Sequence, residues 1–265
     1  MNRAGLRPMI AADILKLRRH RPTMATAAVL SVGITAAYLA IIVARHAGHL
    51  PGGQTLADGT SLMGLYFGSF AAILIGTEAG TIDTGSGVFR DLAATGRSRA
   101  LLFATRIPAA VTVALGFTLS GFLLTVAAAF AFRGSAPAPG LGLILSSAGW
   151  VVLATTVVTA LAVGVGSFTG SRSVTLTAII GWQAIATGFL YLASFLGAAR
   201  DLVLLIALSR LSPDPAIGTR AHPGSSNALN NYKLPMPVGT AILVILAWAV
   251  IPAVAGAWRT RNRDA

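Results

Sequence analysis

The sequence predicts an all-α integral membrane protein with six transmembrane helices, an N-terminal amphipathic interfacial helix, and both termini in the cytoplasm. Three observations predict this class. Hydrophobic residues make up 55% of the 265 residues and charged residues only 11%, a balance that water-soluble domains do not have. The apolar residues are gathered in runs long enough to cross a bilayer. Finally, the 20 Lys and Arg residues lie almost entirely in the connections between these runs.

The first span is predicted over residues 23–43, directly after a basic segment that covers residues 1–22. No charged residue occurs between Arg21 and Arg45, and this uncharged run reaches the length of about 20 residues that a membrane-crossing helix needs. A cleavable signal peptide has a shorter apolar region, of about 7–15 residues. We therefore expect this segment to remain in the protein as its first span.

Five further apolar runs complete a transmembrane domain that we expect to extend over residues 23–258. They cover residues 60–77, 101–132, 141–168, 174–196 and 238–258. A basic cytoplasmic tail, residues 259–265, follows the last of them.

The predicted extracytoplasmic insertion, residues 197–237, contains a seventh apolar stretch at 202–208. Charged residues flank this stretch, and it is too short to cross the bilayer. We favour an interfacial or re-entrant helix here, and the alternative is a buried turn of the outer loop.

The distribution of basic residues sets the orientation. With six spans, 14 Lys and Arg residues lie on the side of both termini and 6 lie on the other side. The positive-inside rule then places both termini in the cytoplasm, and the excess positive charge is explained by attraction to anionic membrane lipids. Because the charges are spread over several short loops, we expect no nucleic-acid partner. The Arg-rich, Ala- and Gly-rich composition is typical of a GC-rich bacterial genome, and hence of a bacterial plasma membrane.

The N-terminal segment reads as an amphipathic helix. Four apolar residues share one helical face, with charged residues elsewhere: Met9, Ile10, Ile14 and Leu17 against Asp13, Lys16 and Arg18. The alternative is a disordered basic tail.

Spans two to five carry glycines spaced four residues apart, which let helix backbones approach closely in lipid. The pairs are Gly64 and Gly68, Gly76 and Gly80, and Gly166 and Gly170. We expect these glycines to pack helices within one chain, and the alternative is a dimer seam.

Several kinds of chemistry have no sequence support, and we expect a protein that is not an enzyme and binds no cofactor or metal itself. There are no cysteines, and neither Lys16 nor Lys233 lies in a phosphate-binding glycine pattern. His46 and His49 would share a metal only if further ligands joined them, and we expect solvated histidines instead.

Inside the predicted spans the polar groups are few and neutral. The residues that we regard as possible pathway residues are Gln183, Trp182, Tyr66 and Tyr191. Glu78 ends the second span and Arg106 begins the third, so both are expected to reach the cytoplasmic interface. The lack of other ionisable groups argues against an ion-coupled carrier.

The predicted coupling loop, residues 78–100, is the most distinctive polar segment. A short amphipathic helix is expected at 88–94, where Phe89 and Leu92 lie beside charged residues in a pattern typical of a docking surface. Gly96 is placed to end this helix and Ser98 to cap the next one.

This loop resembles the permease subunits of type-2 ABC exporters. In that family an acidic residue ends the second span and is followed by the pattern Gly-Thr-x-Arg-x-Leu-Leu-Ala-Thr-x-x-Ser-Arg. Residues 87–99 match it here, with Val88 in place of Thr and Gly96 in place of the usual Pro. Glu78 and Asp83 both fit the acidic position. The aromatic-then-Arg-Asp C-terminus and the layout of interfacial helix and six spans are also similar to the family.

The resemblance implies a permease that forms the substrate pathway of an ATP-driven exporter. A second permease subunit, identical or different, would complete the pathway, and a cytoplasmic ATP-binding subunit would carry ATP and Mg. The implied coupling contacts are Phe89, Arg90, Asp91, Leu92, Arg97 and Arg99, and the implied loop anchors are Glu78, Asp83, Gly87 and Ser98. The alternatives are an ion-coupled secondary carrier and a membrane scaffold or sensor.

Overall fold

A computed structural model describes residues 3–45, 52–85, 98–135, 137–192, 197–213 and 236–262, and every regular element in these ranges is helical. The elements are α1 (Arg3–Arg19), α2 (Arg21–Ala28), the π-helix η1 (Val29–Gly33), α3 (Ile34–Arg45), α4 (Gly52–Gly64), α5 (Phe67–Gly85), α7 (Arg99–Ala131), α8 (Leu141–Thr169), α9 (Arg172–Leu192), the 3₁₀-helix η3 (Gly197–Leu202), α10 (Leu204–Arg210) and α11 (Val238–Asn262).

Five helical segments in this part of the chain are long and apolar enough to cross a membrane. They are Arg21–Arg45, Thr55–Asp83, Arg99–Ala131, Leu141–Thr169 and Val238–Asn262. The protein is therefore an all-α, multi-pass membrane protein, as the sequence predicted. These segments overlap five of the six predicted spans. The remaining predicted span, residues 174–196, is the fifth along the chain and coincides in part with α9. Its crossing of the membrane stays a prediction.

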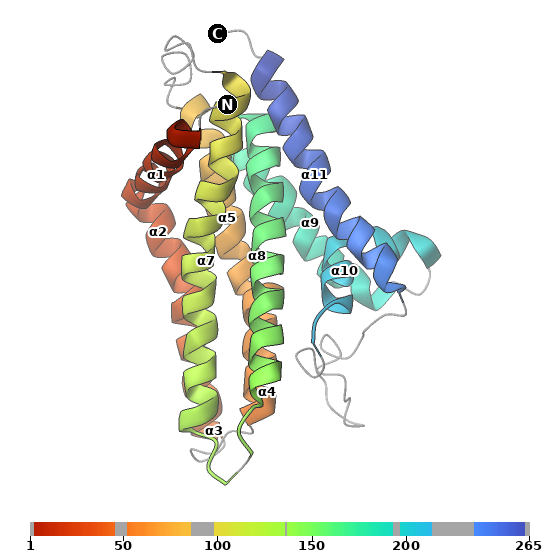
Figure 1. Ribbon diagram of the computed structural model, residues 1–265. Coiled ribbons are helices and arrows are strands. Elements are labelled where there is room, and N and C mark those ends of the chain that lie inside the picture. The colour runs from red at the N-terminus through yellow and green to blue at the C-terminus, as the bar shows by residue number, and fades with distance from the viewer. Residues whose placement is uncertain are drawn as a thin grey trace.

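The helices form an elongated bundle (Figure 1). Helices α1 to α3 lie along one side of α7, while α9, α10 and α11 lie together on the other side of α8. The start of α1 and the end of α11 lie at the same end of the bundle, which we call the terminal end. The connection between α7 and α8 lies at the opposite end, the distal end. Termini on one side agree with an even number of crossings, although the compartment that they face stays a prediction.

Helices α5 and α8 form the centre of the bundle. In the second and fourth candidate spans, 72% of the apolar window is buried, against 22% in the first span and 17% in α11. The two central helices approach through glycine, because a Cβ on Gly76 or Gly80 would lie 2.7 Å from a carbonyl oxygen of α8. Gly166 faces α5 in return. Since α8 is covered on several sides and α11 on few, the surface presented to lipid belongs mainly to the outer helices.

The glycine spacing therefore serves packing inside the chain, as expected. Gly64 lies against the ring of Trp150 in α8, where an added Cβ would come within 2.1 Å of it. Gly170 has a different function: it ends α8 in the left-handed conformation, with φ of 70°.

The short apolar stretch after α9 is a buried helical element. Residues 204–208 of α10 are all buried, and α10 packs against α11. Two tryptophans hold it in place: Trp150 Nε1 donates to the Leu208 carbonyl and Trp248 Nε1 to the Leu202 carbonyl, each at 2.8 Å. The Leu208 carbonyl also accepts from the Leu211 amide at 3.2 Å, so the tryptophan bond is its second. The helix predicted at 202–208 thus exists, and it is inserted among the long helices rather than lying apart from them (Figure 1).

Helices α8 and α11 cross at glycine, which generates a stability prediction. A Cβ on Gly164 would lie 2.4 Å from the Pro252 carbonyl carbon, whereas one on Gly149 of the same helix meets no atom within 4 Å. We expect Gly164→Ala to lower the free energy of unfolding by about 1–3 kcal/mol through overpacking. The matched control Gly149→Ala should leave it unchanged or slightly higher. Thermal unfolding of both variants in detergent checks this, and equal midpoints would contradict the close approach.

Candidate functional site

The acidic residues at the end of the second span turn into the protein. Glu78 and Asp83 lie in the last turns of α5, and Arg106 lies two turns into α7. Their exposures are only 5%, 4% and 3%. Both Glu78 and Arg106 are enclosed by neighbouring helices rather than exposed to water, and their place at the cytoplasmic interface stays a prediction. Buried charges need partners, and each of these has them.

Asp83 joins three helices. Arg106 Nη2 donates to Asp83 Oδ2 at 2.8 Å, which links α7 to α5. Lys16 of α1 forms a second ion pair, with Asp83 Oδ1. A hydrogen bond from Thr105 Oγ1 to Asp13 Oδ2, 2.8 Å long, adds a second contact between α7 and α1. The N-terminal helix is therefore fastened to the two helices that border the predicted coupling loop.

Glu78 is the centre of a second set of contacts. Thr23 Oγ1 of α2 donates to Glu78 Oε2 at 3.1 Å, and Arg172 Nε of α9 lies 3.3 Å from the same oxygen. His20 Nδ1 lies 2.7 Å from Thr23 Oγ1, and His20 Nε2 lies 3.5 Å from Glu78 Oε1. Because the single hydroxyl proton of Thr23 goes to Glu78, His20 must donate through Nδ1.

We call these groups together the ionic cluster. Its members are Asp13, Lys16, His20, Thr23, Glu78, Asp83, Thr105, Arg106 and Arg172. Three carboxylates face three basic side chains, so the formal charges balance without counting the histidine. Burial lowers the pKa of Lys16 from its ordinary value, with the neighbouring Arg106 charge contributing, while Asp13 acts in the opposite direction. The balance matters because a buried ion pair that loses one member leaves an uncompensated charge.

Asp13 and Lys16, which the sequence placed away from the apolar face of the N-terminal helix, are partly buried in the structure. The helix itself is confirmed as α1, with Met9 and Leu17 buried. However, Asp13, Lys16 and His20 follow Met9 at helical spacing, so the polar groups share the packed face. The signal that would have found them is this 4-3-4 spacing of Met9, Asp13, Lys16 and His20. Nothing local to Thr105 or Arg172 marks them as partners.

Five of the six predicted coupling contacts and the predicted loop anchor Gly87 lie outside the described residues; the five are Phe89, Arg90, Asp91, Leu92 and Arg97. The two that follow them are described. Ser98 caps α7 as predicted, because its side chain accepts a hydrogen bond from the Leu101 amide at 3.3 Å. Arg99 Nη1 donates to the carbonyl of Arg261 at 3.4 Å, a favourable position for a cation near the C-terminus of α11.

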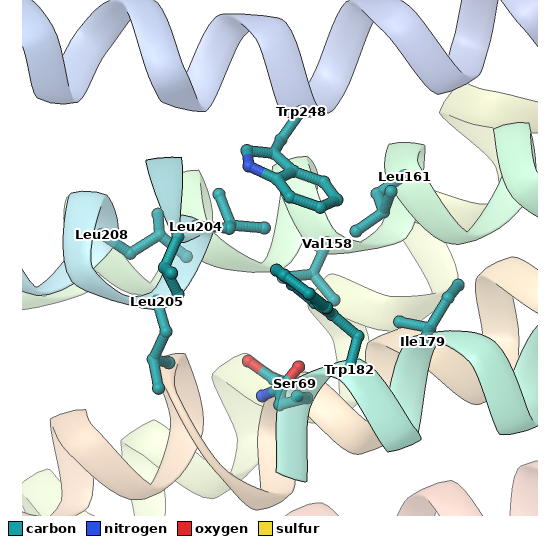
Figure 2. A pocket seen from close by; sticks show the side chains of 11 residues that line it. Ser69, Val158, Leu161, Ile179, Trp182, Leu204, Leu205, Leu208 and Trp248 are labelled. Atoms are coloured by element: carbon teal, nitrogen blue, oxygen red, sulfur yellow. The ribbon is translucent and has the colours of Figure 1, made fainter. Parts of the chain in front are cut away.

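Two of the four predicted pathway residues border a cavity (Figure 2). Trp182 and Gln183 line it from α9, and α10 contributes three leucines, Leu204, Leu205 and Leu208. The rings of Trp182 and Trp248 lie at its edge, with centroids 5.9 Å apart and planes inclined by 32°. Tyr66 lies in the interruption between α4 and α5, and the side chain of Tyr191 is outside the described part.

The cavity is small and mostly apolar. Its volume is about 30 Å³, and one water needs roughly 10–15 Å³ of such space. Gln183 Nε2 donates to the Leu65 carbonyl at 2.8 Å, so its amide is used to satisfy the backbone of the second span. This arrangement of the helices has room for about two water molecules there, and not for a cargo.

Comparison with known proteins adds no family assignment: no family model, curated protein or solved structure matches the chain.

Within the described ranges, no group of three or more His, Asp or Glu residues is placed to hold a metal ion.

The ionic cluster generates a stability prediction. Arg106→Met should lower the free energy of unfolding by about 3–5 kcal/mol, since it leaves a buried carboxylate with less compensation. Adding Asp83→Asn should recover part of that loss, because the half-exposed Lys16 can then turn to water. Thermal unfolding measures both, with Arg133→Met at an exposed site as control. If the double variant loses the sum of the two single losses, the two residues are not energetically coupled.

Proposed function

We propose that the chain is the membrane-spanning permease subunit of an ATP-driven ABC transporter, working as an exporter. It forms the substrate pathway, and a separate cytoplasmic subunit binds ATP and Mg and hydrolyses the nucleotide. A second permease subunit completes the pathway in the bacterial plasma membrane. The apolar character of the spans suits an apolar or amphiphilic cargo.

One observation carries this proposal. The segment that resembles the family's coupling loop follows α5 and precedes α7 in the sequence, and charged groups of these two helices meet in the ionic cluster. Asp83 and Arg106 are 2.8 Å apart across that gap. Lys16 ties them to α1, and the neighbouring Glu78 is tied to α9 through Arg172. A displacement of the loop would therefore be transmitted to several helices at once. Coupling of ATP-driven closure of the ATP-binding subunits to the permease needs such a connection.

The buried carboxylates favour a second candidate more than the sequence did. Ion-coupled secondary carriers use buried Asp or Glu residues to bind protons or cations. Glu78 and Asp83 are buried, yet Arg172 and Arg106 lie close enough to compete with a transported cation. The permease proposal therefore keeps priority. Uptake or export in vesicles driven by an ion gradient, with ATP absent, would favour the carrier.

The docking assignment generates a binding prediction. Affinity purification of the chain from its native membrane should retain an ATP-binding subunit in about equal amount, identified by mass spectrometry. Replacing Arg90 and Asp91 together with Ala should leave the protein inserted but reduce the retained subunit about tenfold or more, because charged docking contacts are worth several kcal/mol.

The matched control is Arg133→Ala, because Arg133 is exposed and lies in the connection between α7 and α8 at the distal end. This variant should retain the ATP-binding subunit as the unsubstituted chain does. Full retention by the Arg90 and Asp91 variant would overturn the docking site alone. Purification of the unsubstituted chain without any ATP-binding subunit would overturn the permease proposal itself.

A further inference from the structure

The first two spans are both interrupted within the bundle. In the first, the π-helix η1 separates α2 from α3. In the second, residues 65–66 separate α4 from α5. Side chains satisfy the backbone at both places: Ser31 Oγ donates to the Ala27 carbonyl and Ser69 Oγ to the Gly64 carbonyl, each at 2.6 Å. Irregular backbone inside a membrane protein is tolerated where its polar groups find such partners.

The two interruptions meet at one point on α7. A Cβ on Gly121 would lie 2.7 Å from the Ser31 carbonyl oxygen of η1 and 2.5 Å from Met63 Sδ in the last turn of α4. Both irregular segments therefore rest against the same glycine and lie at the same level of the bundle. Met63 is fully enclosed. Its flexible thioether can adapt when α4 moves against α7 at Gly121.

Hydrogen bonds join the first and second spans on each side of this level. Toward the distal end, Tyr38 Oη of α3 donates to Asp58 Oδ2 of α4 at 2.7 Å. Toward the terminal end, Thr23 of α2 donates to Glu78 of α5. The segments thus form two pairs, an inner pair of α2 with α5 and an outer pair of α3 with α4.

We propose that η1 and residues 65–66 form one hinge, at which the outer pair moves as a single body against α7 and the inner pair. Helix ends and π-helical turns are the places where a chain absorbs changes in φ and ψ at low cost. The inner pair is held by the ionic cluster and by the glycine contacts of α5 with α8. Among the residues described, the outer pair has no ion pair to α7 or α8, and its close contacts with them are those of Gly59 with Thr125 and of Gly64 with Trp150.

The hinge borders the cavity. Ser69 and Gln183 line the cavity and also bind the two carbonyls at the interruption of the second span, those of Gly64 and Leu65. Rotation of α4 about residues 65–66 changes the position of these acceptors relative to α9. The rotation of α4 therefore changes the volume of the cavity, which in this arrangement is too small for a cargo.

The absence of native cysteines allows a direct test with pairs of spin labels on the full chain in lipid nanodiscs. The pair Ile41→Cys and Leu145→Cys reports α3 against α8, and Leu123→Cys with Leu145→Cys is the reference within α7 and α8. All three sites are exposed. The hinge predicts a distance distribution for the first pair that is broader than the reference or has two maxima. Equal widths for the two pairs would overturn the hinge.

A third pair tests whether the outer helices move together. Ile41→Cys with Gly53→Cys, where a side chain meets no neighbour, should give a narrow distribution. Tyr38→Phe, which removes the donor to Asp58, should broaden it. A broad distribution in the unsubstituted background would contradict movement as one body.

Substitution at the shared contact provides the matched control. Gly121→Ala should shift or narrow the distribution of the Ile41 and Leu145 pair, while Gly116→Ala on the same helix, with no atom within 4 Å, should not. If both substitutions change the distance distribution equally, the contact at Gly121 does not control the hinge.

Discussion

The rest of the structure depends on one constraint: inside the bilayer, the protein itself must satisfy every charge and every backbone polar group. The ionic cluster meets it by setting three carboxylates against three basic side chains. Many hydroxyls of the spans meet it by donating to carbonyls four residues earlier, as Thr35 does to Ser31 and Thr60 to Leu56, whereas Thr77 and Ser147 are buried without such a bond. The inserted α10 meets it through two tryptophan donors. Where a helix is interrupted, Ser69 and Gln183 supply the missing partners.

This constraint also explains what the sequence could predict. Helix class and most span positions follow from apolar length alone, and the cap at Ser98 follows from its position before an apolar run. The ionic cluster could be predicted only in part, because its contacts join distant residues, such as Thr23 and Arg172, which are 149 positions apart. The interruption at 65–66 has no local signal stronger than glycine and serine, and these residues are common in membrane helices. Long-range contacts decide both features.

The two ends of the bundle differ in how firmly they are held. At the terminal end, ion pairs and hydrogen bonds connect α1, α2, α5, α7 and α9 around Glu78 and Asp83. The two carboxylates are buried, so a variant that removes one of their basic partners leaves a buried charge with less compensation. At the distal end, a hydrogen bond between neutral Tyr38 and the Asp58 carboxylate joins α3 and α4. The bundle therefore has ion pairs at its terminal end, whereas at the distal end α3 and α4 are joined by a hydrogen bond and α4 packs closely against α7 and α8.

The helices that line the cavity differ in how closely they pack against one another. Helices α5 and α8 contact each other backbone to backbone at Gly76 and Gly80, and the gap between them is too narrow for any side chain to adjust. Close packing of this kind does not deform gradually, so a path is easier to open elsewhere. The remaining helices of the lining are α9, α10 and α11, and α4 contributes no side chain to it. Helix α4 is instead held by close contacts of Gly59 with Thr125 of α7 and of Gly64 with Trp150 of α8, so its displacement has to separate both of these contacts.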